Sequence, residues 1–165
     1  MTAARRTAAQ LDELERRLGR DVELAFAGPV GAWQDADLAR ATTVQGARRL
    51  VDVARTTGIE SAATQLLVNR LQTQRGELAP LGHPEYGSRH HELVGEPNTE
   101  RTRNLVKLHV LECLRHEPRV ARVLRCDVTS APRPRDVVRI DMTVRLVDRA
   151  EPFNLVVPFE LGGGA

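Results

Sequence analysis

The chain has 165 residues, of which 41% are hydrophobic but only 3% aromatic, and a formal net charge of +2. This length suffices for one domain with a sizeable core, which must be built from aliphatic side chains. The 24 basic and 22 acidic residues are interspersed. The sequence therefore lacks the basic stripe that is typical of a nucleic-acid-binding protein. No apolar run approaches the roughly 20 residues of a membrane span, and no secretory signal follows the basic start. We expect a protein that is cytoplasmic at synthesis, with neither nucleic acid nor membrane as a partner.

The N-terminal part has a helical pattern followed by an alternating one. Leucines recur at helical spacing in residues 8–18 (AAQLDELERRL), which predicts a helix. Apolar residues alternate from Val22 to Phe26, which predicts a short strand. Residues 37–58 are ambiguous, because they can continue a helix or form a short extended piece.

Two amphipathic helices are predicted in the middle of the chain. The first has an apolar stripe at the 3.6-residue period over residues 59–71. The second begins after Asn98 or Thr99, either of which can cap it, and carries Glu100 in its first turn. Pro118 ends this helix. Its apolar face is wide, so we expect it to be covered on two sides.

The C-terminal third changes to the two-residue period of strands. Apolar residues alternate over 124–128, 138–146 and 155–159, which predicts an antiparallel meander with one buried face closed by helices. Pro158 cannot donate to a hydrogen-bond ladder, so the last strand should lie at a sheet edge. The predicted fold class is α+β, with two or three helices packed on a small, mostly antiparallel sheet with an exposed edge strand. The glycine-rich tail, 162–165, is predicted to be flexible.

Residue types used in catalysis and metal binding are present, but without the spacing that such sites need. His109, Glu112 and His116 have helical spacing, yet no HExxH or paired CxxC occurs, and a solvated helix face is the simpler interpretation. Ser88 is not part of a GxSxG sequence. Several glutamates in loop-rich segments could form the carboxylate pair of a glycosidase, but they need no special cause. These are Glu77, Glu85, Glu92, Glu96 and Glu117. We therefore expect no catalytic residue, no metal and no cofactor.

The two cysteines fall on different predicted elements. Cys113 lies on the second helix and Cys126 on the first strand of the meander. A disulfide would require their Cα atoms to be close, so a buried, reduced pair is the favoured interpretation.

Two turn-rich segments accompany the second helix. In HPEYGS, glycine tolerates a positive φ angle and Pro84 restrains its neighbour. In HEPRV, Pro118 leaves Glu117 and Arg119 on either side of the helix end. Such a pair can present a carboxylate and a guanidinium to a partner. Alternatively, Arg119 folds back on the carbonyl groups of the helix end, and residue chemistry alone leaves both alternatives open.

Six segments follow one another over residues 59–161: LLVNRLQTQRGEL, PEYGSRHHELVGEPN, RTRNLVKLHVLECL, EPRV, VVRIDMTVRLVD and NLVVPFEL. In these segments the sequence resembles the GPW or gene 25-like family of baseplate-wedge proteins, known from contractile phage tails, type VI secretion baseplates and extracellular contractile injection systems. The order and spacing of the segments make the resemblance specific. Residues 1–45 fit poorly and are interpreted as an N-terminal extension, before a gene 25-like domain over 46–161. His90 and His91 also depart from the pattern, because a bulky apolar residue is expected there.

The resemblance implies a structural, non-enzymatic protein that links the wedge core bundle to the first sheath ring and nucleates sheath assembly. Its partners would be the larger baseplate wedge subunits, the sheath protein and central spike or hub proteins. Glu117, Pro118 and Arg119 would contact the wedge core bundle. A supporting turn would consist of Pro84, Glu85, Tyr86, Gly87 and Ser88. The last strand would offer an edge for the sheath through Leu155, Val156, Val157, Pro158 and Phe159.

The family also carries a historical lysozyme designation, so lysozyme-like peptidoglycan hydrolysis is the alternative function. Glu77 and Glu85 would be the first carboxylates to test for it. The structural interpretation predicts instead that Arg119→Ala or Glu117→Ala leaves a folded protein that fails to assemble.

Overall fold

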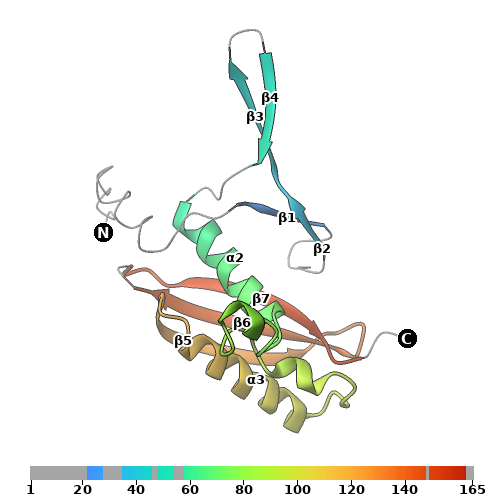
Figure 1. The fold of residues 1–165 in the computed structure, drawn as a ribbon. Helices are drawn as coiled ribbons and strands as arrows, with labels where there is room; N and C mark the ends of the chain where they lie inside the picture. The colour runs from blue at the N-terminus through green and yellow to red at the C-terminus, as the bar shows by residue number, and fades with distance from the viewer. Residues whose placement is uncertain (1–21, 28–34, 46–47, 54–57, 148, 163–165) are drawn as a thin grey trace.

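The structure, a computed structural model, describes residues 22–27, 35–45, 48–53, 58–147 and 149–162 (Figure 1). The N-terminal part contains strands β1 (Leu24–Ala27), β2 (Asp35–Leu38), β3 (Arg40–Gln45) and β4 (Arg48–Val53). Helix α2 (Gly58–Gln72), the 3₁₀ helices η1 (Ala79–Leu81) and η2 (His90–Leu93) and helix α3 (Glu100–Arg115) follow. Strands β5 (Val120–Ser130), β6 (Val137–Leu146) and β7 (Phe153–Glu160) complete the chain. The helix predicted over residues 8–18 lies outside the described residues.

The last three strands form an antiparallel sheet in the order β5-β6-β7. Burial alternates along β6, where Val138, Ile140 and Met142 are fully buried while Arg139 and Arg145 are exposed. Because the buried side chains of α2 and α3 join this same apolar cluster, both helices cover one face of the sheet. The predicted α+β fold, with two helices on a small antiparallel sheet, is confirmed.

Strand β5 departs from the predicted alternation. Its register shifts between Val120 and Arg122 and again between Val123 and Arg125, so the strand is bulged at two places. Cys126 reaches the core, but Leu124 is 47% exposed. The prediction that Leu124 belongs to the buried face is therefore wrong, because a bulge adds a residue and changes which side chains face the core.

Helix α3 begins where the sequence predicted, but its outer side is open. Thr99 is the N-cap, and its side-chain oxygen accepts a hydrogen bond from the Thr102 N–H at 3.2 Å. Val106 and Val110 are fully buried, whereas Leu108 is 57% exposed. Strand β5, helix α2 and η2 all pack against α3, so only the side that carries Leu108 is left open by the described residues.

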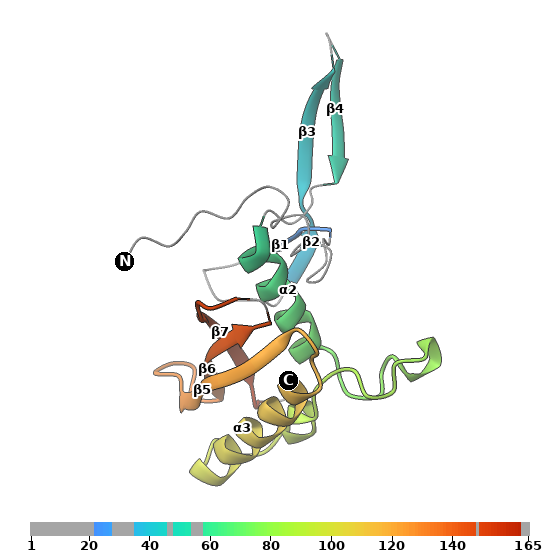
Figure 2. The ribbon, with the colours of Figure 1, turned by 90° about the vertical axis from the view of Figure 1, so that its left-hand side faces the viewer.

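Residues 40–45 and 48–53 pair as two antiparallel strands, so the described part of the ambiguous segment up to residue 53 is extended chain. Strands β3 and β4 pair from Arg40 opposite Val53 to Gln45 opposite Arg48. The hairpin projects away from the three-stranded sheet in both views (Figures 1 and 2). It crosses the boundary predicted between residues 45 and 46, and that domain boundary stays a prediction.

One buried polar residue fastens the N-terminal strands to the helices. Gln65 on α2 is 5% exposed, and its side-chain Oε1 accepts a hydrogen bond from the Leu24 N–H at 2.9 Å. Its Nε2 donates to the Val22 carbonyl at 2.7 Å. The amide of Gln65 thus pairs with the β1 backbone as a neighbouring strand would.

The cysteine prediction is confirmed. Cys113 and Cys126 are both free and buried. Burial raises the pKa of the Cys113 thiol, and it raises the pKa of the Cys126 thiol to about 11. Neither residue has the lowered pKa that marks a reactive thiol.

Within the described ranges, no helix has both the length and the apolar character needed to cross a bilayer.

Candidate partner-binding site

The turn between α3 and β5 contains the three residues for which partner contact was predicted. Glu117 is only 5% exposed. Its Oε2 accepts a hydrogen bond from Arg70 Nη1 at 3.1 Å, and its Oε1 accepts one from the Arg119 backbone N–H at 3.2 Å. Both carboxylate oxygens are therefore used inside the domain. In this conformation Glu117 shapes the turn, and Pro118 and Arg119 are the residues that reach the surface.

Arg70, on α2, occupies the C-terminal end of α3. Its Nε donates to the Cys113 carbonyl at 3.3 Å and its Nη2 donates to the His116 carbonyl at 3.2 Å. These carbonyl groups are among those that a helix end leaves without an intrahelical partner. The alternative in which Arg119 folds back on them is wrong, because the Arg70 guanidinium fills that position. Sequence reading missed Arg70, since 47 residues separate it from Glu117.

The segment Pro84–Ser88 packs against the other side of Arg70. The Tyr86 ring lies under the Arg70 guanidinium, with Arg70 Cζ 4.7 Å from the ring centroid, a cation–π geometry. Burial raises the pKa of Tyr86. The Ser88 N–H donates to the Thr73 carbonyl at 2.9 Å, which joins the segment to the end of α2. The structure thus brings the two predicted segments together around one buried arginine.

Gly87 is the tightest point of this segment. Its φ angle is +99°, and a Cβ at this position would lie 2.6 Å from the Thr73 carbonyl oxygen. We expect Gly87→Ala to lower the free energy of unfolding by more than about 2 kcal/mol, since it adds a backbone clash to the cost of a left-handed conformation.

Gly82→Ala is the matched control for Gly87→Ala. Gly82 has a similar φ angle of +87°, but no atom lies within 4 Å of its added Cβ. Only the conformational cost of about 1–2 kcal/mol is expected there. Urea unfolding of both variants measures the difference, and equal losses would contradict the packing described for Gly87.

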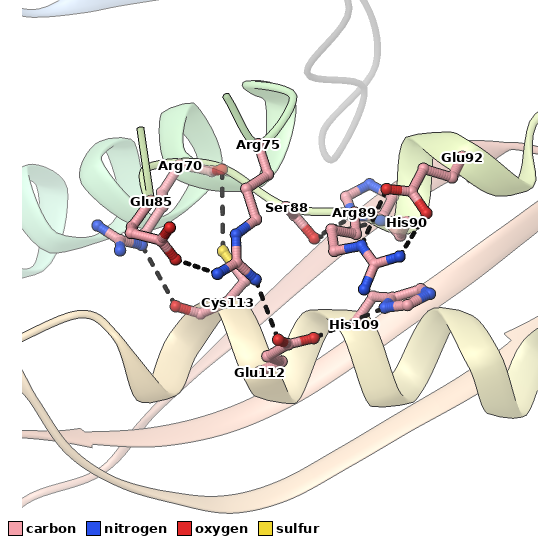
Figure 3. Close-up of polar contacts among 10 residues, drawn as sticks. All are labelled: Arg70, Arg75, Glu85, Ser88, Arg89, His90, Glu92, His109, Glu112 and Cys113. Carbon is pink, nitrogen blue, oxygen red and sulfur yellow. Dashed lines mark hydrogen bonds and ion pairs between the residues drawn. The ribbon is translucent and has the colours of Figure 1, made fainter. Parts of the chain in front are cut away.

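Ion pairs tie the segment to both helices (Figure 3). Arg75, just after α2, pairs with Glu85 and also with Glu112 of α3, the latter at 3.0 Å. Arg89 pairs with Glu92 at 2.9 Å. A hydrogen bond from Arg75 lowers the pKa of Glu112, and one from Arg89 lowers the pKa of Glu92. These groups are held ionised, whereas the general acid of a glycosidase needs a raised pKa.

The histidine and glutamate trio of α3 does not behave as one solvated face. His116 is exposed, but the His109 side chain is only 12% exposed, with Nδ1 3.8 Å from Glu112 Oε2. The interpretation of all three as solvated residues is therefore wrong for His109. Within the described residues, no group of three histidine, cysteine or acidic side chains could hold a metal ion.

His90 occupies an apolar site as a neutral ring. It is 3% exposed, its Nδ1 lies 2.7 Å from Ser88 Oγ, and the Phe159 ring meets it edge-on at 4.4 Å between centroids. Burial lowers the pKa of His90 to about 3. The stacking of His90 on His91, with centroids 4.3 Å apart, shows how polar rings fill the place of a bulky apolar residue.

We expect the depressed pKa of His90 to make stability depend on pH. Between about pH 3 and pH 6.5 the unfolded chain binds a proton at this site and the folded chain does not. The stabilisation is therefore complete above pH 6.5 and is lost as the pH falls, by up to about 1.4 kcal/mol per pH unit.

Urea unfolding at pH 7, 6 and 5 measures this dependence. His90→Phe should remove most of the slope, whereas His83→Gln, at an exposed position, should keep it. A slope that His90→Phe leaves unchanged would contradict the assignment.

Strand β7 lies at an edge of the sheet, as Pro158 predicted. It pairs with β6 in continuous register, and no other described strand pairs with it. Leu155, Val157 and Phe159 point into the core. Of the five residues predicted to meet the sheath, Val156 and Pro158 are half-buried, so these two side chains are the ones placed to contact another chain.

The comparison with solved structures finds a likeness, whereas the sequence comparisons find none. No protein-family model matches the sequence, and a search of curated proteins finds no match. Among solved structures, the chain is similar to a candidate tail lysozyme from Geobacter sulfurreducens, with a TM-score of 0.57 and 26% sequence identity. The similarity covers 66% of this chain and 96% of that protein. Most of this chain therefore shares the fold of a tail-related protein.

Proposed function

We propose that this protein is a structural part of a phage-type tail, built into the baseplate wedge of a contractile tail or injection system. It links the wedge core bundle to the first sheath ring and nucleates sheath assembly. The observation that carries this proposal is the docking turn, Glu117–Arg119, which is fixed from inside while Pro118 and Arg119 stay accessible. The likeness to a candidate tail lysozyme from Geobacter sulfurreducens supports a tail-related role. The order of the sequence segments before and after EPRV, which resembles that of the gene 25-like family, supports the wedge assignment.

The arrangement of charges favours contact over catalysis. Glu85 and Glu92 pair with surface arginines, and Glu117 pairs with buried Arg70. A carboxylate that an arginine holds ionised is poorly suited to protonate a leaving group. We propose a non-enzymatic protein whose partners are larger wedge subunits, the sheath protein and central spike or hub proteins.

Strand β7 supports the proposed contact with the sheath. An edge strand offers unpaired backbone groups to which an extended segment can add. The other edge, β5, carries two bulges, whereas β7 has an uninterrupted register. Strand addition is thus better suited to β7.

Removal of the Arg119 guanidinium tests the proposal. We expect Arg119→Ala to fold with unchanged stability, because the side chain is 38% exposed and its Nε lies 3.8 Å from Glu117. Cells that carry the complete tail gene set and this variant should form baseplates without polymerised sheath, as seen by electron microscopy. Arg101→Ala, an exposed arginine in the first turn of α3, is the control and should assemble normally. Normal, contractile particles with Arg119→Ala would overturn the docking role.

Peptidoglycan hydrolysis is the second candidate, because the similar solved structure is designated a tail lysozyme. The purified protein is incubated with cell-wall substrate, alongside Glu77→Gln and Glu85→Gln. Turnover by the wild type that either variant abolishes would replace the structural proposal with an enzymatic one. We expect no turnover from any of the three.

A further inference from the structure

We propose that Arg70 is a positioning residue for the docking turn and that the Arg119 guanidinium binds a side-chain carboxylate of the partner protein. The inference rests on the proposed function, because it names the chemistry of the same turn. It adds a residue from another helix, Arg70, and a ligand class.

The backbone of the turn is held from several directions. The Glu117 carboxylate joins Arg70 on one side and the Arg119 N–H on the other, at 3.1 and 3.2 Å. The Val120 N–H donates to the Glu117 carbonyl at 3.0 Å, and the Val147 N–H donates to the Arg119 carbonyl at 2.9 Å. The Arg119 side chain therefore projects from a backbone position that these hydrogen bonds hold in place.

The outer edge of the Arg119 guanidinium remains available. Its Nε lies 3.8 Å from Glu117 Oε1, and no described residue forms a hydrogen bond with its Nη1 or Nη2. Two parallel N–H groups in one plane match the two oxygens of a carboxylate. The geometry therefore fits an aspartate or glutamate side chain that approaches from outside.

The charges around the turn also favour an acidic partner. Arg115 at the end of α3 and Arg122 on β5 are exposed, and neither pairs with an acidic group among the described residues. Arg122 lies directly opposite Arg145, another exposed arginine, and like charges in that position repel one another. An acidic protein surface relieves this repulsion. Nucleic acid is disfavoured, since the chain carries 24 basic and 22 acidic residues without a basic stripe.

Arg70 keeps the outer edge of the Arg119 guanidinium available by satisfying Glu117. A buried carboxylate without a cation is costly, so it recruits the nearest one. Arg119 is that neighbour, at 3.8 Å. Without Arg70, the Arg119 guanidinium would close onto Glu117 and would no longer be available to the partner. Arg70 thus acts on the partner contact through Glu117 without touching the partner.

The first experiment compares incorporation of variants into particles from cells with the complete tail gene set. Particles are purified, and the amount of variant per particle is measured by mass spectrometry and normalised to its folded fraction. We expect Arg70→Met to reduce incorporation about tenfold or more, the scale of one lost charge-assisted contact. The paired variant Arg70→Met with Glu117→Gln should restore it, because the glutamine oxygen still accepts the Arg119 N–H but does not capture a guanidinium.

A spectroscopic readout separates positioning from stability. The Nε–Hε NMR signal of Arg119 should move on Arg70→Met, as expected when the 3.8 Å ion pair with Glu117 shortens, and return in the paired variant. Arg70→Lys keeps a cation beside Glu117 and should leave the Arg119 signal near its wild-type position. A signal that does not respond to Arg70→Met would overturn the positioning role.

The second experiment identifies the ligand class. Arg119→Lys keeps a charge without the planar fork, whereas Arg119→Gln keeps neither, so incorporation should be lower than wild type for Arg119→Lys and lowest for Arg119→Gln. Equal incorporation of these two variants, whether high or low, would overturn the charge requirement.

In Arg119→Lys particles, a carbodiimide should join the new amine to an aspartate or glutamate of a wedge subunit. Lys107 is the only native lysine, so the cross-linked peptide can be attributed. Particles without such a cross-link would overturn the carboxylate assignment.

The outcomes distinguish this inference from the proposed function. If Arg119→Ala particles assemble normally, the docking role fails and the inference fails with it. If Arg119→Ala blocks assembly while Arg70→Met incorporates like the wild type, only the positioning role of Arg70 fails.

Discussion

Replacing Glu117 with alanine is expected to lower the free energy of unfolding by about 3–5 kcal/mol, the cost of breaking a buried ion pair from one side. The variant leaves the Arg70 guanidinium buried, with only helix-end carbonyls and the Tyr86 ring around it. It also leaves the Arg119 N–H without its acceptor. Urea unfolding followed by circular dichroism measures the loss.

The control for Glu117→Ala is another glutamate that pairs with an arginine. The Glu85 side chain is 65% exposed, so Glu85→Ala should cost less than about 1 kcal/mol. Equal losses in the two variants would contradict the buried role of Glu117. The burial of Glu117 argues against the sequence-based expectation that Glu117→Ala leaves the fold intact. A failure of this variant to assemble could come from unfolding or from loss of docking. Arg119→Ala is the cleaner test of assembly.

The second large effect is expected at the centre of the sheet. Val138 on β6 is fully buried, opposite Ser130 on one side and Phe159 on the other. Val138→Asp places a carboxylate in the aliphatic core without a cation, a cost comparable with the roughly 5–15 kcal/mol that stabilise a typical domain. The protein should be largely unfolded at 25 °C, with a disordered far-UV circular dichroism spectrum and no cooperative transition.

A matched substitution on the same strand tests whether position, and not charge, causes the unfolding. Arg145 is exposed and lies opposite Arg122, so Arg145→Asp removes a repulsion and should leave the fold intact. If Val138→Asp still unfolds in a single cooperative step near the wild-type midpoint, the alternation described for β6 is incorrect.

The elements with strong periodicity could be predicted from the sequence. Helices α2 and α3 and strands β6 and β7 follow simple alternation or a 3.6-residue stripe, and Thr99 and Pro118 mark the limits of α3. These signals are local, because each depends on residues close together in the chain. Pro158 similarly predicted the edge position of β7, since the missing N–H is a property of one residue.

Features that depend on distant contacts could not be predicted. Arg70 looks like an ordinary polar residue of α2, and only the packing of α2 on α3 brings it to Glu117. The bulges of β5 expose Leu124 against its local pattern. Residues 40–53 carry no decisive period, so the choice of a hairpin was invisible in the sequence. His109 was assigned to solvent from helix phase alone, but it is largely covered in the fold.

Helix α2 is fastened by hydrogen bonds at two buried points. Gln65 holds the backbone of β1, and Arg70 holds the end of α3 together with the turn that carries Arg119. The two residues are five positions apart on one helix, a rise of about 7.5 Å. A pull on the turn would therefore reach the base of the N-terminal strands through this helix, in addition to acting on the sheet, which the chain enters at Val120. In a tail that contracts, α2 would therefore transmit a mechanical load from the docking turn to the hairpin formed by β3 and β4.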